Sequence, residues 1–232
     1  MVLSKIRILG SNGDAEEMPA IHTGEPSTFK EHLEICRRTW GDKIAFQEKV
    51  RREWRRYSHN DTYRRSYDLA AGFAAKGVKP GDRVAIILEN GYDWVCTYYG
   101  IVLAGAVAVP IYYDLRPSEI SDMVAHADPV MAVVGTRIFP KAEAALAKLH
   151  TVVLVGADTY HRDSAPSGLM RKPRPELLSL QELVSGATPQ ARQAVTSHVV
   201  QPADLASIVF TSGTSGGQKG VMMKHGNFMA NM

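Results

Sequence analysis

The stretch Ser207-Ile-Val-Phe-Thr-Ser-Gly-Thr-Ser-Gly-Gly-Gln-Lys-Gly-Val-Met-Met-Lys-His-Gly-Asn227 decides how this chain is interpreted. An apolar strand, Ser207–Phe210, leads into a loop of glycine, serine and threonine residues with one lysine, Lys219. Glycine permits positive φ angles and close backbone approach, hydroxyl groups donate hydrogen bonds, and lysine supplies a flexible positive charge. A polyphosphate needs this combination of donors, small side chains and a cation. We therefore predict a phosphate-binding loop.

The predicted loop differs from other phosphate-binding and catalytic loops. The Walker A pattern fails because Gln218 stands where its second glycine belongs and Gly220 follows the lysine. The chain has no G-x-G-x-x-G spacing after a first strand, which disfavours nicotinamide or flavin binding. Ser212 and Ser215 lack the elbow of a serine hydrolase, which remains a weak alternative. A flexible linker is the other reading, but the strand before the loop and the apolar residues after it argue against that.

Thr-Ser-Gly-Thr-Ser-Gly-Gly-Gln-Lys-Gly resembles the phosphate-loop signature of the adenylate-forming superfamily, which includes acyl-CoA synthetases, adenylation domains of peptide synthetases and luciferases. Ser215 replaces a frequent threonine and keeps its hydroxyl group. Gln218 stands where the family usually has proline, which affects the rigidity of the loop and the aim of Lys219. The resemblance implies these residues as ATP-phosphate ligands: Thr211, Ser212, Gly213, Thr214, Ser215, Gly216 and Lys219, with Lys219 also acting in catalysis as the cation over the γ-phosphate.

The resemblance extends over about residues 28–232. The segment Leu69-Ala-Ala-Gly-Phe-Ala-Ala-Lys-Gly-Val-Lys-Pro-Gly-Asp-Arg-Val-Ala-Ile-Ile-Leu-Glu-Asn90, followed by Trp94 and by Gly105-Ala-Val-Ala-Val-Pro-Ile-Tyr112, is similar to the N-terminal subdomain of the family. Val109–Tyr112 and the segment that begins at Gly220 are most similar to long-chain fatty acyl-CoA synthetases. We expect an irregular leader at residues 1–26 and a partial AMP-binding domain at 27–232.

The resemblance implies that a carboxylate attacks the α-phosphate of ATP and that coenzyme A then captures the acyl group, with Mg²⁺ assisting. The expected partners are therefore a carboxylate substrate, ATP and coenzyme A. The family's adenine pocket, metal ligand and C-terminal domain would follow this loop, so we expect a fragment that is inactive alone, poorly soluble, and in need of a C-terminal portion. The alternatives are a non-catalytic binding module, or an adenylation domain for an aryl or amino acid.

Composition agrees with an ordinary globular protein of 232 residues, with 45% hydrophobic residues and a net charge of +3. The two cysteines, Cys36 and Cys96, are far apart and have no metal-type spacing, so we expect neither a disulfide nor a metal site. The first ten residues lack the sustained apolar region of a secretory signal, and we expect a cytoplasmic protein with at most peripheral membrane contact.

Strands and helices alternate along the chain, which predicts an α/β fold with a largely parallel, helix-covered sheet. The charge-free run Trp94–Tyr113 has the length of a membrane span, but Gly100, Gly105 and Pro110 favour a buried helix and strand. The predicted elements are helix 28–40 capped by Ser27, hairpin 44–50 and 54–58, a helix capped by Asn60 that ends near Lys76, strand 83–88, helix 92–104, strand 106–112, helix 118–127, strand 130–134, helix 138–148, strand 151–155, a surface excursion at 158–175, and a short helix at 179–184.

Two further features have more than one interpretation. Six arginines cluster around Trp54 and Tyr57, at positions 51, 52, 55, 56, 64 and 65. A solvated hairpin face is the preferred interpretation, nucleic acid binding has no supporting motif, and contact with anionic lipid stays open. His225 aligns with a family histidine, and we expect it to shape or pack the site rather than to act in catalysis.

Overall fold

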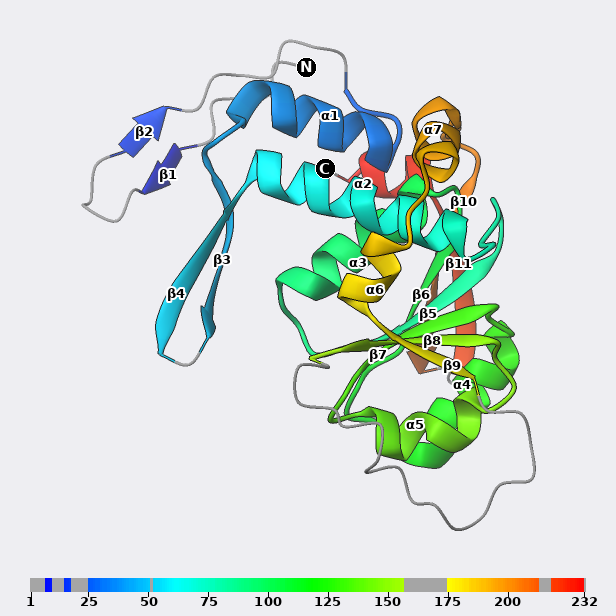
Figure 1. Cartoon of the computed structure of the whole chain (residues 1–232). Helices are drawn as coiled ribbons and strands as arrows, with labels where there is room; N and C mark the ends of the chain where they lie inside the picture. Colours follow the sequence, from blue (N-terminus) through cyan, green and yellow to red (C-terminus); the bar gives the residue numbers. More distant parts are fainter. Residues whose placement is uncertain are drawn as a thin grey trace.

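The computed structural model describes residues 7–9, 15–17, 25–50, 52–156, 175–212 and 218–231. Within these residues, seven strands form a sheet in the order β11-β10-β6-β5-β7-β8-β9 (Figure 1). The strands are β5 (Arg83–Ile87), β6 (Val107–Pro110), β7 (Met131–Gly135), β8 (Thr151–Val155), β9 (Glu176–Ser179), β10 (Leu205–Ser212) and β11 (Gln218–Lys224). Neighbouring strands from β10 to β9 pair in parallel, and β11 pairs antiparallel to β10. The predicted fold class is confirmed.

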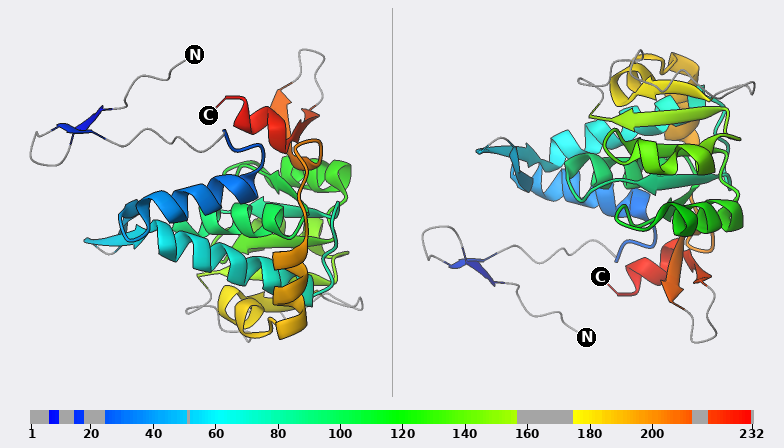
Figure 2. Two further views of the ribbon diagram at one scale, coloured as in Figure 1. Left: turned by 90° about the horizontal axis from the view of Figure 1, so that it is seen from above. Right: turned by 90° about the horizontal axis from the view of Figure 1, so that it is seen from below.

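Helices cover both faces of this sheet (Figures 1 and 2). The helices are α1 (Phe29–Trp40), α2 (His59–Ala75), α3 (Tyr92–Leu103), α4 (Pro117–Ala127), α5 (Phe139–Leu146), α6 (Leu180–Ser185), α7 (Pro189–Ser197) and α8 (His225–Met229). One apolar core joins α2, α3 and α6 to the sheet, and a second joins α4 and α5 to the opposite face. Helix α1 packs against α2 and α3 on the outside. Parallel strands need such crossover helices, which explains the alternation along the chain.

The centre of the sheet is fully buried. In β5, the side chains from Val84 to Ile87 have no exposed surface, as expected for a parallel strand that is covered on both faces. The charge-free run from Trp94 forms α3 and β6 inside this core, where Ile101 and Val109 are also fully buried. The interpretation of this run as core is confirmed. Among the described residues, no helix is both long and apolar enough to cross a membrane.

The boundaries of the elements are close to prediction, but two helix caps are wrong. Helix α1 is capped by Thr28, whose hydroxyl oxygen accepts the Glu31 N–H at 3.2 Å, whereas the predicted cap Ser27 donates to the Glu31 carboxylate. Helix α2 begins at His59, so its cap is Ser58, in a reciprocal capping box with Asp61. Asn60 already lies inside the helix. In both cases the actual cap is a hydroxyl residue within two positions of the predicted one.

The predicted hairpin forms β3 (Ile44–Val50) and β4 (Glu53–Ser58) and extends away from the sheet (Figure 1). Its inner face packs on the start of α3. The ring of Tyr57 stacks on that of Tyr92 at 3.6 Å, and Glu48 accepts hydrogen bonds from the Tyr57 hydroxyl at 2.8 Å and the Tyr92 N–H at 3.1 Å. The Glu48 carboxylate thus satisfies an N–H group at an otherwise uncapped helix start.

Several elements were not predicted. Within residues 1–26, which we expected to be irregular, the strands β1 (Arg7–Leu9) and β2 (Ala15–Glu17) pair antiparallel. Strand β9, helix α7 and helix α8 also have no counterpart in the prediction. The expected surface excursion at 158–175 lies outside the described residues, apart from its last position.

Candidate phosphate-binding site

The β10–β11 hairpin places the predicted loop at the carboxyl edge of the parallel strands. Strand β10 pairs with β6 through Ser207 and Ala108, and the Ser207 hydroxyl donates to the Ala108 carbonyl at 2.8 Å. Because β10 and β6 are parallel, the end of β10 lies at the same edge as the end of β6. Ligands of open α/β sheets bind outside this edge. The described ends of the loop, Ser212 and Gln218, therefore lie at the edge where such ligands bind.

Thr211 and Lys219 are brought together by the pairing of β10 with β11. They are directly opposite each other, and both are exposed. Opposite residues in an antiparallel pair have Cα atoms within about 5.5 Å and side chains on the same face. One hydroxyl donor and one cation therefore share a face at the mouth of the hairpin. Ser212 is opposite Gln218 in the backbone register.

The remaining predicted ligands lie between these two pairs. Gly213, Thr214, Ser215 and Gly216 fall outside the described residues, so their arrangement stays a prediction. The departure at Gln218 has a backbone consequence. Gln218 is the first residue of β11 and is paired with Ser212, and a proline in its place would have no N–H group for the ladder.

Gly220 has a packing role that the sequence reasoning did not identify. A Cβ atom at this position would lie 2.9 Å from Cγ2 of Ile208 and 3.6 Å from Cε1 of Phe210. The Phe210 ring meets the ring of His126 on α4 edge to face, with centroids 5.6 Å apart. The hairpin is thus seated on α4 through Phe210, and glycine at 220 leaves the space for that contact.

Other polar residues at the carboxyl edge were also missed as site candidates. Glu89 follows β5, and Tyr112, Tyr113 and Asp114 follow β6. The rings of Tyr112 and Tyr113 lie 4.9 Å apart, and the neighbouring Tyr112, Asp114 and Glu89 raise the pKa of Tyr113, with Tyr112 the largest cause. The available signal was their position immediately after strands that the sequence had already predicted.

His225 is a packing residue, which agrees with the expectation that it is not catalytic. Only 1% of its surface is exposed, and its Nδ1 atom accepts the Phe29 N–H at 3.3 Å. Its ring also meets that of Phe29 edge to face at 5.5 Å. Burial lowers its pKa from 6.5 to about 4, with Asp204 opposing the shift, so the ring is neutral near pH 7. His225 therefore joins the start of α1 to the end of the hairpin.

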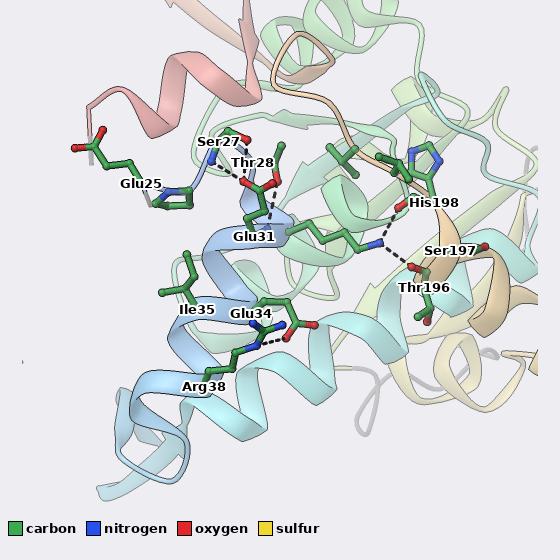
Figure 3. Close-up of a pocket in the computed structure, with 14 residues that line it drawn as sticks. Glu25, Ser27, Thr28, Glu31, Glu34, Ile35, Arg38, Thr196, Ser197 and His198 are labelled. Atoms are coloured by element: carbon green, nitrogen blue, oxygen red, sulfur yellow. Dashed lines mark hydrogen bonds and ion pairs between the residues drawn. The ribbon is translucent and has the colours of Figure 1, made fainter. Parts of the chain in front are cut away.

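A groove of about 630 Å³ lies elsewhere, between the start of α1 and the segment that follows α7 (Figure 3). Lys30 forms its wall and donates to the carbonyl groups of Val195, Thr196 and His198 at 3.2, 2.9 and 2.7 Å. Glu31 accepts hydrogen bonds from Ser27. Lys30 is engaged in holding α1 against the end of α7, and Glu31 is engaged at the start of α1 itself, so the groove does not offer these two charges to a ligand.

The described residues supply neither a metal cluster nor a reactive thiol. No group of three or more histidine, cysteine or acidic side chains in the described part of the chain is arranged to hold a metal ion. Both cysteines are free and buried, and burial raises the pKa of Cys36 to about 11 and that of Cys96 to about 12. Neither thiol is ionised near neutral pH, which excludes the two as thiolate nucleophiles.

The mostly parallel sheet, with its antiparallel hairpin at one side and helices on both faces, defines an α/β protein. The chain belongs to the AMP-binding enzyme family, whose model matches residues 33–232. It is 31% identical over 210 residues to a (methyl-dioxo-octahydro-indenyl)propanoyl:CoA ligase of Rhodococcus jostii (strain RHA1), covering 88% of this chain and 38% of that protein. It is 30% identical over 183 residues to the peroxisomal long chain acyl-CoA synthetase 7 of Arabidopsis thaliana, covering 77% and 25%.

Solved structures agree with the fold. A long-chain-fatty-acid-CoA ligase from Archaeoglobus fulgidus superposes with a TM-score of 0.68 at 22% identity, covering 90% of this chain and 39% of that one. The chain therefore spans about a third of the length of these relatives and corresponds to their N-terminal AMP-binding part. The family resemblance inferred from the loop is confirmed.

Proposed function

We propose that this chain is the N-terminal part of an ATP-dependent acid–CoA ligase and that its β10–β11 loop binds the β- and γ-phosphates of ATP. In the first step, a carboxylate oxygen bonds to the α-phosphorus and the bond to pyrophosphate breaks. In the second, the thiol of coenzyme A bonds to the acyl carbon, AMP leaves, and the thiol proton is released. The single observation that supports this assignment best is the pairing of Thr211 with Lys219 at the carboxyl edge.

The proposed role of the loop is to hold the leaving group. Lys219 is proposed as the catalytic cation over the γ-phosphate, because an exposed lysine on the hairpin can follow a mobile phosphate group. Thr211 would donate its hydroxyl hydrogen from the same face of the hairpin. Fixed donors of this kind stabilise charge that develops on pyrophosphate as it departs. The described residues include no group of three or more histidine, cysteine or acidic side chains that could hold Mg²⁺.

The acyl substrate is proposed at two levels. A carboxylic acid is the class shared by the acyl-CoA ligases among the relatives. A long-chain fatty acid is the more specific proposal, supported by the resemblance of Val109–Tyr112 and of the segment after Gly220 to long-chain enzymes. The two relatives described above differ in the acyl group that their names give. An aryl or amino acid is the second candidate for the substrate.

The phosphate assignment is tested by binding of inorganic pyrophosphate to the purified chain, measured by titration calorimetry. A charge-assisted hydrogen bond contributes about 1.5–3 kcal/mol, so Lys219→Gln should weaken binding by about ten-fold or more. Lys224→Gln is the matched control, since Lys224 is exposed on the same strand but pairs with Leu205 at the far end. Equal losses in both variants would reject the assignment of Lys219.

A further inference from the structure

The β3–β4 hairpin has an outer face that packs against nothing in the described structure. Lys49 is directly opposite Trp54, and Gln47 is directly opposite Arg56, so these four side chains share one face. All four are exposed, and 60% of the surface of Trp54 is accessible. The opposite face carries Phe46 and Tyr57, whose rings contact Tyr92. The hairpin therefore separates a packed inner face from an open outer one.

The acidic residues of the hairpin are confined to one of these two faces. Glu48 and Glu53 occupy positions on the inner face, opposite Arg55 and Val50. The outer face has no acidic residue among its described positions, and Arg52 at the exposed turn adds a further cation. Within the described residues, Lys49, Arg52 and Arg56 form no ion pair. A face that contacts only water does not require its acidic residues to be absent.

The structure divides the arginine cluster that the sequence presents. Arg64 pairs with Asp61 at 2.7 Å, and Arg65 pairs with Asp93 at 3.5 Å. The two aspartates lie in the first turns of α2 and α3. These two arginines are neutralised locally. The outer face, which consists of Gln47, Lys49, Trp54 and Arg56 and adjoins Arg52 at the turn, keeps its positive charge.

We propose that this outer face docks on an anionic lipid surface. Tryptophan prefers the level of the headgroups, where its ring is buried and its N–H stays hydrated, and lysine and arginine are attracted to anionic lipids. The hairpin extends from the body of the molecule (Figures 1 and 2), which leaves its strands clear of the sheet and of the helices that cover it. The indole of Trp54 has the cations of Lys49, Arg52 and Arg56 around it, and this arrangement fits a lipid interface. It fits a nucleic acid duplex less well, because the bases of a duplex are already stacked and cannot stack on the indole. The proposal does not depend on ligase activity.

The first test is co-sedimentation of the purified chain with vesicles of phosphatidylcholine, with and without phosphatidylserine, at low and high salt. We expect binding that requires phosphatidylserine and falls at high salt. One basic side chain near an anionic surface contributes about 1 kcal/mol, or about five-fold in binding, so Arg52→Gln/Arg56→Gln should weaken it by about 25-fold. The control Lys79→Gln/Lys148→Gln removes the same charge from exposed positions on other elements and should change binding by less than about three-fold.

The second test uses the fluorescence of Trp54. Its emission should shift to shorter wavelength on vesicles that contain phosphatidylserine, and Trp54→Phe should remove the shift while the chain stays folded, because this side chain is exposed. A shift that persists in Trp54→Phe, equal losses in the two double variants, or no sedimentation with anionic vesicles would each overturn the proposal. Hairpin-dependent binding of single-stranded DNA without vesicle binding would also overturn it in favour of a nucleic acid surface.

Discussion

His225 illustrates how one buried side chain ties stability to pH. Its pKa is lowered from 6.5 to about 4, so the folded state favours the neutral ring and the unfolded state binds a proton first as the pH falls. Its contribution is therefore fully present above about pH 6.5, decreases between pH 6.5 and about 4, and is constant below that range. At about 1.4 kcal/mol per pKa unit, the loss across this window is at most about 3.5 kcal/mol.

We predict that His225→Phe unfolds more easily near neutral pH but shows a smaller decrease in stability on acidification. The phenyl ring keeps much of the packing against Phe29 and leaves the Phe29 N–H without its acceptor, at a cost of about 1–3 kcal/mol. Urea unfolding across the window measures both effects. His32 and His59 also have pKa values lowered by burial, so the informative quantity is the difference between variant and parent. Parallel pH profiles would show that His225 does not cause the dependence.

Gly100 sets the distance between α2 and α3. A Cβ atom there would lie 2.8 Å from the Leu69 Cβ and 3.3 Å from the Ser66 carbonyl oxygen. At an open helical position, Gly→Ala stabilises by about 1 kcal/mol, whereas overpacking a core costs about 1–3 kcal/mol. We predict that Gly100→Ala lowers the free energy of unfolding by up to about 2 kcal/mol, measured by urea titration. An increase in stability would mean that the two helices separate without cost.

At the scale of an element, Lys30 fixes α7 to α1. Its ammonium group donates to three carbonyl groups at the end of α7, which have no partner within the helix. We predict that Lys30→Met, which keeps the aliphatic stem but removes the donors, destabilises the fold by about 1.5–3 kcal/mol. Amide hydrogen exchange should accelerate in residues 189–198 in particular.

The control for Lys30 is Lys148→Met, at an exposed position outside α5 where we expect a change within about 0.5 kcal/mol. If both variants lose the same stability, or if exchange in α7 is unaffected by Lys30→Met, the three hydrogen bonds do not hold the helix. This anchor was invisible to sequence reasoning, because Lys30 and Val195 are 165 positions apart.

The elements that could be predicted are those whose sequence pattern is local. Strand Thr151–Val155 has the predicted bounds because a short run of β-branched and apolar residues has no competing helical period. Helix α7 was not predicted because only two of its residues, Ala191 and Val195, are buried. Tertiary contacts bury them, and so small an apolar face leaves no clear pattern in the sequence. In the site, Thr211 and Lys219 were predicted as ligands from residue chemistry, but their pairing depends on the β10–β11 register. The packing role of Gly220 depends on Ile208 and Phe210, and through Phe210 on α4.

At the scale of the whole molecule, the sheet ends in an edge that is poorly suited to solvent. Strand β11 is the last strand at one side, and Val209, Val221 and Met222 are exposed to 37%, 42% and 70%. An unpaired edge with exposed apolar side chains favours association with another polypeptide segment. The chain also corresponds to about a third of its relatives. Both observations support the proposal that catalysis needs a further, C-terminal portion.

We predict that the 232-residue chain alone gives no carboxylate-dependent exchange of pyrophosphate into ATP. Weak retention of triphosphate by the loop does not suffice, since millimolar affinity already needs about 4 kcal/mol after ordering costs and the reaction also requires an aligned carboxylate. Supplying the C-terminal two thirds of the Rhodococcus jostii relative as a separate polypeptide should restore exchange, and Lys219→Gln should abolish that restoration. Robust exchange by the isolated chain would refute the requirement for a second portion. A stable, monodisperse chain that is never complemented, yet binds pyrophosphate through Lys219, would favour the non-catalytic module instead.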